Sequence, residues 1–225
     1  MKASKASGTA VLLALAVAAT AGVHADGKPR RSCAPPYARV LGSNRFGAVY
    51  QERGNSEELI SCEGGRTYRE TFQDAPQLFA LDLGGRFFAY PESISDDADP
   101  EGITNIFTSS LSGNRTSAYA ILGSAPPVSE LVDVTKLRLA ANQAMVWIAC
   151  QGASGFGRLL RQCVRDGRRR WVYARPASAN FDTSFVPKLI ATSRHIDARD
   201  LRFSADGRIV TWRQQRKLKR KDIGP

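Results

Sequence analysis

Residues 81–90 read LDLGGRFFAY, and this stretch decides the fold because its pattern occurs three more times along the chain. Two apolar residues at alternating positions are followed by a tight turn and then by a β-rich run that ends in an aromatic residue. Alternation with a period of two predicts strands, and the turn between them predicts an antiparallel hairpin. The other copies are VLGSNRFGAVY at 40–50, LRLAANQAMVW at 137–147 and LRFSADGRIVTW at 201–212.

A second hairpin signal follows each of the first three copies. Gly64-Gly65, Gly113-Asn114 and Asp166-Gly167 supply the positive φ that a tight hairpin turn requires. The strands that these turns would join are 59–62 with 67–72, 106–111 with 116–122, and 159–164 with 170–173. Each unit is therefore expected to contain four antiparallel strands, and the fourth unit ends one strand short.

We therefore predict an all-β fold in which about four antiparallel β-sheet repeats form a small β-propeller-like domain. Residues 32–37 would then supply the strand that the fourth unit lacks and close the ring. A curved β-sandwich built from the same strands is the alternative, because periodicity identifies hairpins but not their closure. The loops between the units differ in length and are the variable part of this frame.

An aromatic residue ends each of the four copies. A row of exposed aromatic rings could stack on carbohydrate, but a residue that holds the same position in every unit is expected to pack one sheet on the next. We therefore predict structural anchors at Tyr50, Tyr90, Trp147 and Trp212.

The N-terminus is typical of a secretory signal peptide. Lys2 and Lys5 precede an apolar stretch from Ala10 to Val23, and Val23-His24-Ala25 resembles a cleavage site. We predict a signal peptide at 1–25 and a single β-propeller-like repeat domain with a basic C-terminal strand at 26–225, secreted or otherwise extracytoplasmic. The apolar stretch is too short for a transmembrane helix, so no membrane span is expected in the mature chain.

Four cysteines in an exported chain predict two structural disulfides, for which three pairings exist. Cys33–Cys62 and Cys150–Cys163 are favoured because each pair joins sequence neighbours within or beside one unit. A metal site formed by the cysteines is disfavoured, because their spacings match no zinc pattern.

The net charge of +11 is concentrated at 165–170 and in the run from Arg213 to Lys221. Outside the cell, such a surface suits an anionic cell-wall polymer or an extracellular protein as partner. The alternative is that charged outer strands keep the protein soluble and block edge pairing. Specific nucleic-acid binding is not expected, because the aromatic interleaving used to read bases is missing.

The sequence contains no motif for catalysis. The glycine-rich stretch at 152–157 has the wrong spacing for a nucleophile elbow and does not open a helix, as a phosphate-binding loop would. His195 precedes Asp197 and Asp200 closely, but a lone histidine in a connecting loop is expected to be solvated. We therefore predict no catalytic residue.

An acidic segment is the only candidate metal site in the sequence. Asp97, Asp99, Glu101 and Asn105 place oxygen ligands at alternate positions, and Gly102 could provide the turn of a calcium loop. Thr108 occupies the place of the expected bidentate glutamate. Calcium is therefore the one cofactor that the sequence suggests, and otherwise none is expected.

Several of these segments together resemble uncharacterised secreted bacterial proteins built from β-propeller-like repeats. The resemblance covers most of the mature chain, and it implies a fold and an exported location without supplying a catalytic residue. It rests on Cys33-Ala34-Pro35-Pro36, Ala48-Val49-Tyr50, Ile60-Ser61-Cys62 with Gly65-Arg66, the run from Leu83 to Tyr90, and the run from Ile196 to Phe203 with Val210-Thr211-Trp212.

Two classes of function fit these observations. The first is a secreted, non-enzymatic binding or scaffold module that uses variable loops on a rigid β frame. The second is an extracellular hydrolase or lyase that acts on polysaccharide from a site in the mouth of the propeller. The lack of a catalytic motif favours the first class, although propellers host both.

Overall fold

The computed structural model divides the chain into two units, residues 1–30 and residues 31–225. It describes residues 33–224 of the second unit, except for 56, 73–74, 77, 97–98, 114, 117–131, 152–162, 164, 166 and 179–186. The predicted signal peptide at 1–25 lies outside the described residues.

The described residues form four separate antiparallel sheets. The first sheet contains β1 (Arg39–Ser43), β2 (Gly47–Gln51), β3 (Glu58–Glu63) and β4 (Arg66–Thr71), paired in chain order. The third sheet repeats this order with β10 (Val132–Leu139), β11 (Met145–Gln151), β12 (Arg170–Arg175) and β13 (Lys188–Ser193). The all-β class is therefore as the sequence predicts.

The second and fourth sheets vary this plan. In the second, β5 (Ala75–Pro76) and β6 (Asp82–Gly84) both pair with β7 (Phe87–Asp96), which continues to β8 (Asp99–Ser110) and β9 (Arg115–Thr116). The fourth has three strands, β14 (Ile196–Phe203), β15 (Ile209–Gln214) and β16 (Lys217–Asp222). A 3-10 turn, η1 (Leu78–Ala80), precedes β6.

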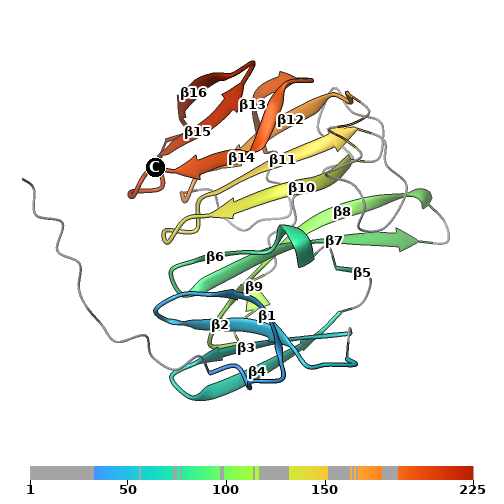
Figure 1. Ribbon diagram of the computed structural model, residues 1–225, viewed down its shortest axis with the longest axis vertical. Coiled ribbons are helices and arrows are strands. Elements are labelled where there is room, and N and C mark those ends of the chain that lie inside the picture. The colour runs from blue at the N-terminus through green and yellow to red at the C-terminus, as the bar shows by residue number, and fades with distance from the viewer. Residues whose placement is uncertain are drawn as a thin grey trace, which may run out of the picture. The chain divides into compact units, whose positions relative to one another are not determined.

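The four sheets follow one another in chain order, from β1–β4 to β14–β16 (Figure 1). The leading strands lie side by side, β1 against β6, β6 against β10 and β10 against β14. Strand pairing among the described residues does not join the fourth sheet to the first. Four sheets in a row also differ from the predicted alternative, a sandwich, which needs two facing sheets.

Three of these leading strands are connected through one half-buried carboxylate. Asp82 of β6 accepts a hydrogen bond from the Leu139 backbone N–H (2.9 Å) and one from the Arg138 Nη1 (2.9 Å), both on β10. The Arg138 Nε donates in turn to the Leu201 carbonyl oxygen on β14 (3.2 Å). This chain of bonds fixes the positions of β6, β10 and β14 relative to one another.

The hairpin turns at one end of these strands also contact each other. The Asn44 side chain donates to the Gly85 carbonyl oxygen (2.8 Å), and the Asn142 side chain donates to the Asp206 carbonyl oxygen (2.9 Å). Gly84 has no room for a side chain, because a Cβ there would lie 2.4 Å from the Ala140 carbonyl oxygen. The polar turn residues of the repeated pattern therefore join neighbouring sheets.

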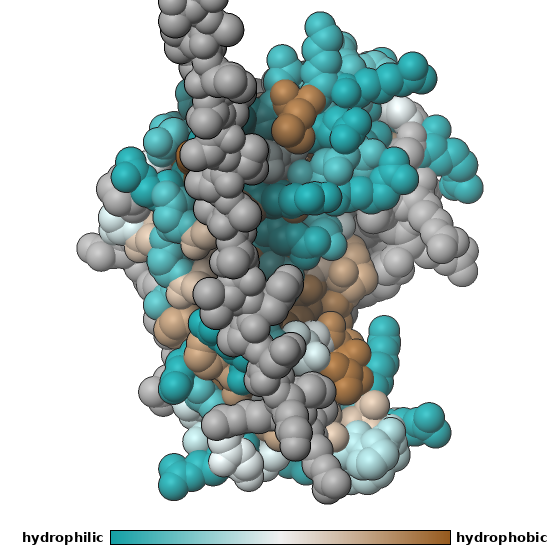
Figure 2. Space-filling view, turned by 60° about the vertical axis from the view of Figure 1, so that its left-hand side comes forward, coloured by the Kyte–Doolittle hydropathy of each residue, from teal (hydrophilic) through white to brown (hydrophobic). Residues whose placement is uncertain are grey.

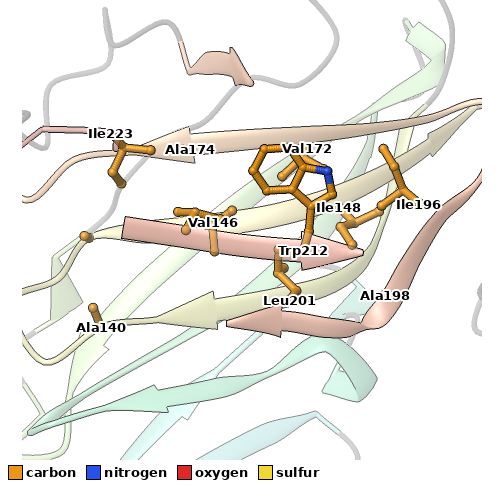
Figure 3. Close-up of a cluster of buried hydrophobic side chains, with 12 residues drawn as sticks. Ala140, Val146, Ile148, Val172, Ala174, Ile196, Ala198, Leu201, Trp212 and Ile223 are labelled. Atoms are coloured by element: carbon orange, nitrogen blue, oxygen red, sulfur yellow. The ribbon is translucent and has the colours of Figure 1, made fainter. Parts of the chain in front are cut away.

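Apolar side chains fill the space between successive sheets. Val49 and Leu59 meet Tyr90 and Phe107 between the first and second sheets. Ala89 and Ile106 of the second sheet pack with Trp147, Trp171 and other residues of the third. The next layer is shown in Figure 3, where the Trp212 ring of β15 lies beside Ile148 and Val172 of the third sheet.

Two details of the predicted strand pattern are wrong. The third strand of the third sheet is β12 rather than residues 159–164, because β11 pairs directly with β12. Of the predicted closing strand at 32–37, the described residues 33–37 do not complete the fourth sheet either. Cys33, Ala34 and Ala38 instead pack against β2 and β3 on the outer face of the first sheet.

Both disulfides join segments close in sequence. Cys33 bonds to Cys62 of β3, and Cys150 of β11 bonds to Cys163, with Cα–Cα distances of 6.0 and 6.3 Å. The first bond holds residues 33–38 on the first sheet, which explains why this segment does not reach β14–β16. In the chain-entropy model, each bond stabilises the fold by about 3 kcal/mol, and structural disulfides of this kind are typical of oxidising compartments.

In the part of the chain that the structure describes, no helix has the length and apolar character needed to cross a bilayer.

Arg138→Met should test the connection between β6, β10 and β14. The substitution leaves the Asp82 carboxylate half-buried, with the Leu139 N–H as its remaining described hydrogen-bond donor. We therefore expect the free energy of unfolding to fall by about 2 kcal/mol at neutral pH. Burial already raises the pKa of Asp82, and Arg138 opposes that rise. Without Arg138 the pKa of Asp82 rises further, so the folded variant takes up a proton at higher pH than the wild type does. The difference in the free energy of unfolding between the two proteins should therefore shrink as the pH falls toward about 4.

Urea unfolding at the two pH values measures this difference. Arg202→Met is the matched control, because Arg202 is 73% exposed and its 3.9 Å pair with Asp200 is a surface ion pair, which contributes little. Equal losses for the two variants would contradict the proposed role of Arg138.

A basic groove as the candidate binding site

A groove of about 1240 Å³ lies where the third and fourth sheets meet. It is bordered by the start of β12, the turn between β13 and β14, the start of β14 and the end of β15. Asp197 is the only acidic residue among the described residues that line it. The basic lining consists of Arg165, Arg170, Arg194, Arg199, Arg213 and Arg216, together with His195.

Arg170 is the buried member of this set, with 5% of its surface exposed. It begins β12 and shares a strand face with Val172 and Ala174, which pack against the fourth sheet. Its Nη1 donates to the Ile196 carbonyl oxygen, whereas its Nε has no hydrogen-bond acceptor among the described residues. Burial lowers the pKa of Arg170, and nearby Asp197 offsets part of that effect.

Two other arginines of the groove are fixed by aspartates. Arg199 contacts both carboxylate oxygens of Asp197, with the shortest bond, from Nη2, at 2.7 Å. These bonds from Arg199 are the main reason that the pKa of Asp197 is lowered to about 2. Arg213 donates from Nε to Asp200 at 2.6 Å. The two guanidinium groups are therefore positioned before any ligand arrives.

Exposed basic residues lie at both turns that border the groove. Arg194 precedes β14, and Arg216 follows β15 in a two-residue turn in which both residues have positive φ. Figure 2 shows a largely hydrophilic surface at the end of the view where the fourth sheet lies. The groove therefore offers positive charge both at its floor and at its rim.

His195 lies in the groove but not in a catalytic arrangement. Its backbone N–H donates to the Ser193 Oγ (3.1 Å), and its carbonyl oxygen accepts from the Gln215 N–H (3.1 Å). The two aspartates that follow it in sequence are bound by Arg199 and Arg213. Proximity in sequence therefore does not give His195 a carboxylate partner, and the groove is suited to binding an anion.

The acidic segment does not form the predicted loop. Asp97 lies outside the described residues, whereas Asp99, Glu101 and Asn105 all belong to the extended strand β8. Six residues of extended chain span about 20 Å, so the backbone does not curl to bring Asn105 beside Asp99. Asn105 itself is buried. Among the residues that the structure describes, no group of three or more acidic, histidine or cysteine side chains could hold a metal ion.

All four predicted anchors are buried, each on the second strand of a repeated hairpin. Tyr90, Trp147 and Trp212 lie between successive sheets, whereas Tyr50 packs beneath residues 33–38. Tyr90 also donates from its hydroxyl to Glu70 (2.6 Å). None of the four is placed to stack on a carbohydrate ligand.

Sequence reasoning missed Arg170 as a site residue and counted it among the charges of the 165–170 cluster. The alternation along β12 contained a signal, because Arg170 lies two residues before Val172 and four before Ala174, on the face that is otherwise apolar. An arginine at an inward position of a strand is rare unless it is paired or functional.

Comparison with known proteins gives no relative from which a function could be transferred. No protein-family model matches the chain, and no curated protein matches it.

The Asp197–Arg199 pair should stabilise the protein only above acidic pH. The pKa of Asp197 in the folded protein, about 2, lies below the value of about 3.9 for an unfolded aspartate. The contribution of this carboxylate is therefore complete above that unfolded value and is lost as the pH falls toward 2. We expect Asp197→Asn to be less stable than the wild type near neutral pH and nearly equal to it at the acid limit.

The urea midpoint as a function of pH measures this effect. A stability difference that is the same at every pH would show that Asp197 acts through packing rather than through its charge.

Proposed function

We propose that this protein is a secreted, non-enzymatic module that binds an anionic polymer of the cell surface in the basic groove. The observation that carries the proposal is Arg170, a buried guanidinium in the groove whose Nε lacks an acceptor among the described residues. A buried donor without an acceptor costs free energy. Because Arg170 also lines the groove, a carboxylate or phosphate group bound there would be attracted to its positive charge and offset part of that cost.

The kind of cation in the groove supports the choice of ligand. The permanently charged basic side chains among the described lining residues are all arginines. The planar guanidinium matches carboxylate and phosphate oxygens in a two-point contact that lysine cannot make. Asp197 and Asp200 hold two of these groups in place. Less side-chain entropy is therefore lost when an anion binds.

The arrangement of the sheets and the disulfides support the proposal of a secreted binding module. We interpret the row of four sheets as part of a propeller-like arrangement in which the leading strands are innermost. Two disulfides and the signal-like N-terminus suit an extracytoplasmic location, as does the resemblance to secreted repeat proteins. The only described carboxylate lining the groove is engaged by Arg199, so no observation there favours the hydrolase or lyase.

Binding to polymers of known chemistry tests the proposal. We expect the purified protein to bind immobilised polygalacturonate and inorganic polyphosphate but not neutral dextran, with binding that weakens as salt rises. Arg170→Met should weaken binding about tenfold, which corresponds to about 1.4 kcal/mol. Arg170→Lys keeps the charge without the planar fork and should fall between the wild type and Arg170→Met.

Arg66→Met is the matched control, because it removes one positive charge from the exposed strand β4 of the first sheet. We expect it to reduce affinity less than twofold. Equal effects of Arg66→Met and Arg170→Met would mean that net charge alone retains the polymer, and the groove would then not be the site. The melting temperature of each variant shows whether a loss of binding comes from unfolding.

A further inference from the structure

We propose that the outer edge of β16, which has no neighbouring strand among the described residues, is a docking site for an acidic, extended segment of a partner protein that adds to the fourth sheet as its next strand. The proposal concerns a surface separate from the lining of the groove, which reaches Arg216 but no residue of β16. It therefore does not rest on the proposed function.

The first observation is that β16 is an ordered and regular edge strand. All six residues from Lys217 to Asp222 pair with β15 without a bulge, and all six side chains are exposed. The strand is held at its end by Ile223, which is buried and donates its N–H to the Arg208 carbonyl oxygen (2.9 Å). Among the described strands, β16 has a neighbour on one side only, whereas the first and third sheets contain four strands.

The hairpin geometry shows which backbone groups face outward. Gln215 and Arg216 have φ values of 51° and 63°, as in a two-residue type I′ turn, so Gln214 and Lys217 form the hydrogen-bonded pair next to it. Such pairs alternate along an antiparallel ladder. Lys217, Lys219 and Lys221 therefore point their backbone groups toward β15. The N–H and C=O groups of Leu218, Arg220 and Asp222 face the outer edge.

The charges on β16 select the partner. Lys217, Lys219 and Lys221 alternate with the other residues, so they form a row on one face of the strand. A second copy of β16 would place lysines opposite lysines, which is destabilising. The row therefore favours a strand with acidic residues at every second position. On the other face, Leu218 is 67% exposed and would gain contact with an apolar residue of the added strand.

Backbone pairing explains these features better than simple attraction of a polyanion. A flexible polyanion needs no straight edge, no regular register and no exposed leucine, whereas an added β-strand uses all three. Main-chain hydrogen bonds would provide affinity, and the alternating side chains would provide specificity.

A peptide with alternating acidic and apolar residues, acetyl-(Glu-Val)5-amide, tests the proposal with the intact protein. We expect it to slow amide hydrogen exchange at Leu218, Arg220 and Asp222 by at least about tenfold at saturation. The amides of the three lysines are already bonded to β15 and should change little. The same peptide with N-methyl groups at alternate residues keeps its charge but cannot donate a hydrogen bond from those residues. Where the methylated residues are the ones that face β16, the peptide should lose binding.

Two variants of one residue separate backbone pairing from charge. Arg220→Pro removes an outward N–H without touching the β15 ladder, as proline is tolerated on a solvent-facing edge, and should weaken peptide binding at least about tenfold. Arg220→Ala removes the same charge but keeps the N–H, and should weaken binding less than about threefold. The exchange rates of Lys219 and Lys221 report whether the sheet is intact in each variant.

Three results would overturn the proposal. The first is equal binding of Arg220→Pro and Arg220→Ala, which would mean that charge alone matters. The second is unchanged binding of the N-methylated peptide in both possible methylation registers. The third is equal protection of the outward amides by polygalacturonate, which has no peptide backbone and would identify β16 as a surface for polyanions instead.

Discussion

The structure depends on the contact of Asp82 with Arg138 and Leu139, and on the continuation of that contact to Leu201. Among the described residues no strand pairing joins neighbouring sheets, so apolar packing and hydrogen bonds between side chains and backbone connect them. Apolar packing between sheets is strong but not directional. Charged hydrogen bonds at the leading strands set which residue of one sheet faces which residue of the next.

This internal order has a consequence for the surface of the fourth sheet. Its inner face carries Trp212 and Val210 against the third sheet, so its outer face and its edge carry the charges. Asp197 and Asp200 neutralise part of that charge and hold Arg199 and Arg213 in place. The remaining positive charge of this sheet lies along the groove and on β16.

Much of the fold was predictable from local sequence. The alternating residues and polar turns of the four copies identify β1 with β2, β6 with β7, β10 with β11 and β14 with β15, because a hairpin is specified by its own residues. The third strand of the third sheet was assigned to residues 159–164 instead of β12, since an apolar run before Asp166-Gly167 is typical of a strand in a hairpin. Three of the four residues of the predicted calcium loop lie on β8, because acidic residues at alternate positions also fit an extended strand.

The sequence by itself determined the all-β class, the hairpins and the two pairs of nearby cysteines, because these depend on period, turn residues and short separations. Only the tertiary structure decided that residues 33–38 cover the first sheet, that Arg170 is buried in a groove and that β16 is an edge among the described strands. Each of these depends on segments far apart in sequence. Hydrophobic period shows which side of a strand is buried, but not which segment buries it.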